Sequence, residues 1–140
     1  MARRIENDTN SQKRSIIDKK ISSENKYPIF DFGKVDHEGP FRFAAPETQD
    51  ARLLCSKILE FSKMTWAEIE GPKNHSLEKG KKGISKEGQK RIRLKINEDD
   101  NGDIFSFRLG STQRLIGVRK DEVFEVIWYD KEHKFYPSKK

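Results

Sequence analysis

The chain has 140 residues, about the length of one domain, with a formal net charge of +6 and a mean hydropathy of -0.93. Hydrophobic residues make up only 33% of it, which predicts a small core, and the basic excess favours a polyanionic partner. No apolar run is long enough to span a membrane, Met1–Lys20 lacks the apolar stretch of a secretory signal, and the single cysteine excludes an internal disulfide and a cysteine-based zinc site. We therefore expect a soluble cytoplasmic protein that uses no metal or other cofactor.

Residues 1–26 are expected to form a flexible basic tail. Ile5 is the only large apolar residue near the start, and Ile16, Ile17 and Ile21 give a weak helical stripe in a Lys-rich background. The alternative is a short segment that becomes ordered on a partner protein. The remaining 27–140 is predicted to be one domain.

Aromatic and β-branched residues begin at Tyr27, which indicates that the folded part starts there. A strand is predicted near 29–35, then a turn through His37–Pro40 and a short extended piece over 41–43. If 41–43 is extended, the alternation of Phe41 and Phe43 places both rings on one face.

Three helices are predicted next. The first begins at Pro46 and has an apolar stripe, on which Cys55 is expected to be a buried structural thiol: Ala51, Leu54, Cys55, Ile58, Leu59 and Phe61. The second begins at a capping box formed by Thr65 and Glu68 and ends at Gly71-Pro72.

The stretch 72–83 is predicted to be a loop, and Ser85 is predicted to cap a third, strongly basic helix over 86–96. Ile84, Ile92 and Ile96 are expected on its buried side. Its basic side chains and their neighbours are candidate contacts to an RNA backbone: Lys82, Lys86, Lys90, Arg91, Arg93 and Lys134.

The last third of the domain is predicted to be a three-stranded meander, with strands at 104–109, 114–119 and 123–129. The connections are short, and short connections join antiparallel neighbours. Together with the helices this predicts an α+β fold, with the helices on one face of a mainly antiparallel sheet.

Four side chains near the C-terminus have the chemistry that phosphodiester cleavage needs. Arg108 ends one predicted strand and Arg114 begins the next, so the turn between them brings two phosphate-binding guanidiniums together. His133 is a candidate acid or base, and Tyr136 can donate a hydrogen bond or stack on a base. These two reach the arginines only if the last segment folds back along the sheet. No metal is required when cations of the protein stabilise the phosphate.

This order of strands and side chains resembles the C-terminal part of RelE/YoeB-like toxins of bacterial type II toxin–antitoxin systems. It covers about 104–136 and includes the segments Phe107–Gly110, Gln113–Val118 and His133–Tyr136. The resemblance implies a RelE-like fold and an endoribonuclease that cleaves mRNA at the ribosome through the 2′-hydroxyl and is neutralised by an antitoxin. It also implies that Arg108 and Arg114 hold the phosphate, that His133 transfers a proton and that Tyr136 is the closing aromatic residue.

The sequence departs from that pattern in three ways. The chain is longer at its N-terminus, Tyr136 lies three residues after His133 instead of next to it, and Glu87 is the only candidate for a carboxylate base. One alternative is a non-catalytic module of a phage or mobile element that binds RNA or a protein, in which the arginines are ordinary sheet residues. Another is a toxin directed at gyrase, which would damage DNA and leave mRNA intact.

Overall fold

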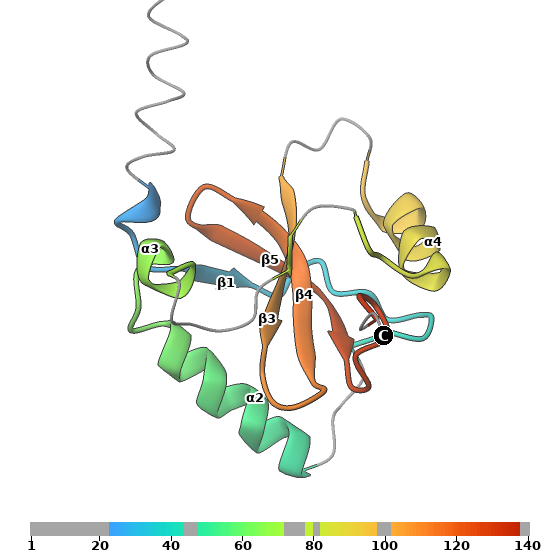
Figure 1. The fold of residues 1–140 in the computed structure, drawn as a ribbon, viewed down its shortest axis with the longest axis horizontal. Helices are drawn as coiled ribbons and strands as arrows, with labels where there is room; N and C mark the ends of the chain where they lie inside the picture. Colours follow the sequence, from blue (N-terminus) through green and yellow to red (C-terminus); the bar gives the residue numbers. More distant parts are fainter. Residues whose placement is uncertain (1–22, 44–47, 72–77, 80–81, 98–101, 138–140) are drawn as a thin grey trace, which may run out of the picture.

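The computed structural model describes residues 23–43, 48–71, 78–79, 82–97 and 102–137, and it contains one sheet flanked by helices (Figure 1). The sheet has five strands in the order β1-β5-β4-β3-β2. The strands are β1 (Ile29–Asp31), β2 (Glu78–Lys79), β3 (Asp103–Arg108), β4 (Arg114–Lys120) and β5 (Val123–Asp130). The helices are α2 (Thr48–Phe61), α3 (Trp66–Ile69) and α4 (Lys86–Lys95).

The predicted meander is confirmed, because β3, β4 and β5 form successive antiparallel pairs. The strand predicted over 29–35 is shorter and joins the sheet as β1, parallel to β5. It ends where the Asp31 carboxylate accepts a hydrogen bond from the Gly33 N–H at 2.8 Å, which turns the chain. The prediction of a continuous loop over 72–83 is wrong, since Glu78 and Lys79 form β2 against β3.

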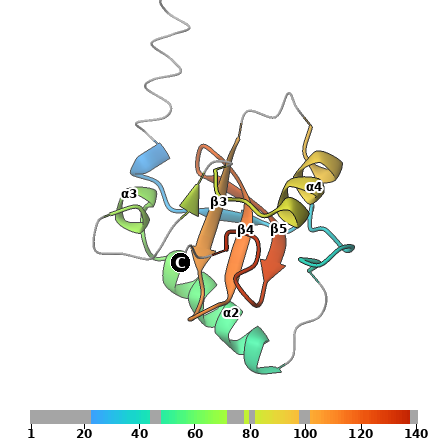
Figure 2. The same ribbon diagram turned by 45° about the vertical axis from the view of Figure 1, so that its right-hand side comes forward.

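The fold is α+β, but the prediction that all helices lie on one face of the sheet is wrong (Figure 2). Phe105 and Phe107 pack with α2 and α3, whereas Ile104 packs with Ile92 of α4. Successive strand residues point to opposite faces, so the two helical layers cover opposite sides. The central strands are apolar on both faces, and each apolar face has to be buried.

A β-bulge in β5 allows this strand to contribute side chains to both helical layers. The register between β4 and β5 shifts at Gly117, which pairs with Val126, while Ile116 pairs with Trp128, so Ile127 is the extra residue. A Cβ at Gly117 would lie 1.9 Å from the Glu125 carbonyl oxygen, so only glycine fits where the bulged strand approaches. Val126 packs on the α2 side and Trp128 on the α4 side.

Both helix caps predicted from the sequence are confirmed. Thr65 and Glu68 form the capping box of α3, and the Ser85 hydroxyl accepts a hydrogen bond from the Gly88 N–H at the start of α4. Ile84 and Ile92 are buried on the inner side of α4, and Ile96 is partly buried there. Pro46, where the first helix was predicted to begin, lies outside the described residues.

The predicted buried face of α2 is partly wrong. Leu54, Ile58 and Phe61 do face the sheet, but Cys55 is exposed and Leu59 is 64% exposed. These last two form a second stripe at the same spacing, rotated by one residue, and the sheet contacts only the first. Cys55 is therefore not the buried thiol that the pattern predicts.

Phe41 and Phe43 do not share a face. Phe41 packs with the α4 layer and Phe43 with the α2 layer. The alternation rule fails because residues 41–43 are not a strand. Phe41 is in a turn, its carbonyl accepts a hydrogen bond from the Tyr129 N–H at 3.1 Å, and the Phe43 N–H donates to the Asp36 carbonyl at 2.7 Å.

Ser23 to Lys26, which the sequence assigned to the tail, contact the domain. Ser23 is buried, and the Lys26 carbonyl accepts a hydrogen bond from the Trp66 N–H at 3.0 Å. The packed chain therefore extends at least to Ser23, and residues 1–22 lie outside the described residues.

Candidate functional site

Arg108 and Arg114 lie directly opposite each other across β3 and β4, as the sequence predicts. Directly opposed residues project from the same face, which here is the face that α4 covers. Arg108 is exposed at the strand end, and its Nε donates to the Gly110 carbonyl at 3.3 Å. The side chain of Arg108 is thus held at the hairpin and is exposed.

Arg114 is 5% exposed. Its Nη1 donates to the carbonyls of Gly110 and Gln113, both at 3.0 Å, and to that of Ser111 at 3.4 Å. Arg114 therefore stabilises the hairpin that carries Arg108, whereas the sequence predicts direct contact with phosphate.

His133 lies in a tight turn that follows β5. The turn begins at Asp130, the residue opposite Arg114 on β5. The Asp130 carboxylate accepts hydrogen bonds from the Lys134 N–H at 3.0 Å and the Phe135 N–H at 2.8 Å. His133 itself has a φ of 60°, in the left-handed region that few residues other than glycine adopt.

The hairpin and the His133 turn are joined directly. The Thr112 hydroxyl donates to the Lys131 carbonyl at 2.8 Å, and Arg114 and Asp130 are neighbours in the sheet. The last segment thus folds back along the sheet. This fold-back is what the sequence analysis requires for His133 to lie near the two arginines. Arg108, Arg114 and Asp130 form one row across three strands, and His133 follows three residues after the end of that row.

Tyr136 is 3% exposed and belongs to the core on the α4 side. Its ring lies 5.6 Å from that of Phe135. It helps to anchor the segment after His133 and does not present a phenol ring to solvent, contrary to the role that the sequence suggests.

The N-terminal end of α4 lies beside this segment, because the Ser85 N–H donates to the Phe135 carbonyl at 2.9 Å. The basic side chains predicted there are mostly exposed: Lys82, Lys86, Lys90, Arg93 and Lys134. Lys86, Lys90 and Arg93 follow the helical spacing of one outer face. None of those three forms an ion pair with another residue that the structure describes, and the candidate base Glu87 is exposed on the first turn.

Arg91 is the exception, and its prediction as an RNA contact is corrected. Its Nε and Nη2 donate to the two carboxylate oxygens of Asp36, both at 2.9 Å. Asp36 is 1% exposed and also accepts a hydrogen bond from Trp128 Nε1 at 2.9 Å. Burial raises the pKa of Asp36, but the hydrogen bonds from Arg91, Trp128 and the Glu38 N–H outweigh it and hold this pKa below its ordinary 3.8.

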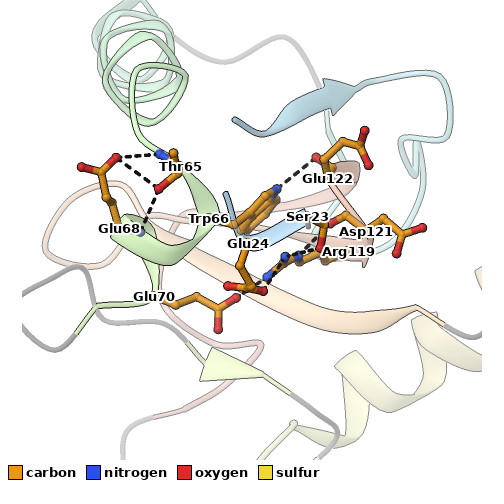
Figure 3. Close-up of polar contacts among 9 residues, drawn as sticks. All are labelled: Ser23, Glu24, Thr65, Trp66, Glu68, Glu70, Arg119, Asp121 and Glu122. Atoms are coloured by element: carbon orange, nitrogen blue, oxygen red, sulfur yellow. Dashed lines mark hydrogen bonds and ion pairs between the residues drawn. The ribbon is translucent and has the colours of Figure 1, made fainter. Parts of the chain in front are cut away.

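A second half-buried arginine is also structural (Figure 3). Arg119 lies over the Trp66 ring, 4.1 Å from its centroid, and pairs with Glu24 at 2.7 Å and with Glu70. The contacts to Glu24 and to the Ser23 hydroxyl attach the start of the described chain to α3 and β4.

Three residues with structural roles were not predicted from the sequence. Thr112 and Asp130 fix the hairpin and the His133 turn, and Asp36 joins α4 to β5. The role of Asp130 could have been predicted from the sequence, because an aspartate that ends a strand often accepts hydrogen bonds from the turn that follows. The roles of Asp36 and Thr112 could not have been predicted, since their partners, Arg91 and Lys131, lie 55 and 19 residues away along the chain.

Within the described residues, no group of three or more His, Cys, Asp and Glu is placed to hold a metal ion. No described helix has the length and apolar character needed to cross a membrane.

Comparison of the chain with protein-family models, with curated proteins and with solved structures found no match.

Proposed function

We propose that this protein is a toxin-like, metal-independent endoribonuclease that cleaves mRNA, with the ribosome as the place of action and an antitoxin protein as its inhibitor. The observation that carries the proposal is the direct attachment of the His133 turn to the hairpin of Arg108, through Thr112 and the neighbouring Arg114 and Asp130. An exposed arginine side chain and an imidazole are thereby held at one end of the sheet.

These groups have the chemistry that RNA cleavage requires. The 2′-hydroxyl of the RNA attacks the adjacent phosphorus, and the 5′-oxygen leaves. One proton has to be removed and one supplied, and the imidazole of His133 is suited to one of these transfers at neutral pH. Arg108 stabilises the charge that develops on the phosphate. Arg114 contributes by fixing the hairpin.

The exposed face of α4 supplies the RNA-binding surface in this proposal. Lys86, Lys90 and Arg93 lie on that face, and the start of the helix is hydrogen-bonded to the segment that follows His133. A row of cations leading to a cleavage site attracts the RNA backbone and positions it without reading its sequence.

A purified-component assay tests the proposal. A defined mRNA is incubated with the protein, free and in a reconstituted bacterial translation system, and the 5′ and 3′ ends of the products are identified. Cleavage that leaves 2′,3′-cyclic phosphate ends, and that slows at least about 100-fold in His133→Ala and Arg108→Ala to a small residual rate, is the expected result. Arg52→Ala, an exposed arginine on α2, is the matched control and should cleave as the wild type does.

The burial of Arg114 and Tyr136 favours one alternative, an RNA-binding module without nuclease activity. Under this alternative the same α4 face binds RNA, and the row across the sheet is structural. RNA binding with intact RNA in the assay above would select it.

A further inference from the structure

We propose that Asp130 is a positioning residue for His133: its buried carboxylate fixes the turn that holds the imidazole at the end of the Arg108–Arg114 row, and in this way controls the rate of RNA cleavage. The catalytic part of this inference rests on the proposed function. The geometric part depends only on the turn itself.

The backbone at His133 has a positive φ, which few side chains adopt. Its φ of 60° costs free energy for a residue with a Cβ, and histidine, asparagine and aspartate are the side chains that adopt this region most often, as Asp121 also does here with a φ of 55°. A strained conformation persists only where the surroundings fix it. The His133 side chain is only partly buried, so the conformation of the turn depends mainly on the contacts of the residues around it.

Hydrogen bonds and ring packing fix the turn on both sides of His133. The Asp130 carboxylate accepts from the two N–H groups that follow His133, those of Lys134 and Phe135. The Thr112 hydroxyl holds the Lys131 carbonyl on the other side. The Phe135 ring is fully buried against Trp128, at 5.0 Å between centroids. The turn is therefore fixed before and after His133.

The burial of Asp130 itself costs free energy. A carboxylate that is 2% exposed loses its hydration and has to regain that free energy from hydrogen bonds. Hydrogen bonds from N–H groups to a charged acceptor are stronger than neutral ones, and Asp130 uses both of its oxygen atoms on this turn. The carboxylate thus stabilises the one backbone geometry that holds His133 in place.

Asp130→Asn tests the inference, because an amide NH₂ then opposes one of the two N–H donors. We expect the single-turnover rate of mRNA cleavage to fall about 100-fold, while the RNA concentration for half-saturation stays the same. In a His133→Ala background, Asp130→Asn should cause no further loss of the residual rate. Asp103→Asn, at an exposed position at the start of β3, removes the same charge and should cleave as the wild type does.

An equal loss in both backgrounds, or a wild-type rate in Asp130→Asn, would overturn the inference. If Asp130→Asn does not fold, Thr112→Val removes the other anchor of the turn at an exposed position. The loss of cleavage rate that Thr112→Val causes is then compared in the wild type and in His133→Ala. If the wild type cleaves no RNA, the proposed function fails, and amide exchange still decides the geometric part. Protection of the Lys134 and Phe135 amides should fall at least about tenfold in Asp130→Asn, and unchanged protection would contradict the inference.

Discussion

At the scale of single residues, the same side-chain types have opposite roles in different places. Arg108 is accessible, whereas Arg114 donates to hairpin carbonyls and Arg91 neutralises a buried carboxylate. Sequence spacing identifies residues that can meet, as it does for Arg108 and Arg114. It does not say which guanidinium is used within the fold, because that depends on partners such as Asp36 that are distant in sequence.

The backbone at His133 leads to a prediction about stability. Glycine adopts a φ of 60° without strain, whereas alanine does not. We expect His133→Gly to be more stable than His133→Ala by about 1 kcal/mol, the reverse of their order at ordinary positions. Urea unfolding of both variants measures this difference. Equal stability, or a more stable alanine variant, would show that the turn is not strained in solution.

The pairing of Arg91 and Asp36 predicts a pH-dependent loss. At pH 7, Arg91→Met leaves a buried carboxylate without its cation and should lower the free energy of unfolding by about 3 kcal/mol. The lowered pKa of Asp36 means that the pair stabilises the fold above pH 3.8 and that this contribution is lost as the pH falls further. The difference between wild type and variant should therefore shrink in acid.

Unfolding curves between pH 2 and pH 7 measure this effect. The exposed Arg93→Met on the same helix is the control and should change stability by less than about 0.5 kcal/mol. A difference for Arg91→Met that does not vary with pH would contradict the assignment of its cause to the ionised Asp36.

At the scale of the elements, the sequence predicts the meander and both helix caps because their signals are local. Alternation over 104–109 and the box formed by Thr65 and Glu68 need no knowledge of the rest of the chain. The two-sided helical cover, the bulge at Gly117 and the short β2 could not be predicted in this way. Each of them depends on which distant segment packs against the sheet.

Gly88 of α4 is required by packing, although it interrupts the apolar stripe. A Cβ there would lie 2.7 Å from Ile84 Cγ2 and 3.3 Å from the Phe135 ring. Alanine gains up to about 1 kcal/mol in helix propensity, but overpacking costs about 1–3 kcal/mol, so Gly88→Ala should destabilise the protein. Thermal unfolding of Gly88→Ala, with the exposed Lys90→Ala as the control, measures this change in stability. Increased stability in Gly88→Ala would show that the layer between α4 and the sheet is loosely packed.

At the scale of the whole molecule, basic side chains are either exposed or paired with carboxylates, depending on where they lie in the fold. The side of α4 that points away from the sheet is basic, whereas the basic groups of Arg91 and Arg119 are neutralised inside. We expect Lys86→Glu with Lys90→Glu to weaken RNA binding. The salt dependence of binding should also fall by about 1.4 in log–log slope, since each phosphate that a lysine no longer neutralises accounts for about 0.7.

The control for this prediction makes the same charge change elsewhere. Arg52→Glu with Lys63→Glu alters two exposed residues at the other helical layer and should leave the salt slope unchanged. If both pairs lower RNA affinity equally, binding reflects net charge alone and α4 is not the RNA-binding face.

The most direct test of the central claim is the mapping of mRNA 5′ ends in bacteria after brief expression of the wild type or of His133→Ala. The account predicts growth arrest with new 5′ ends inside coding regions for the wild type. For His133→Ala it predicts intact mRNA at equal protein levels. Intact mRNA with the wild type, or cleavage that persists in His133→Ala, would contradict it.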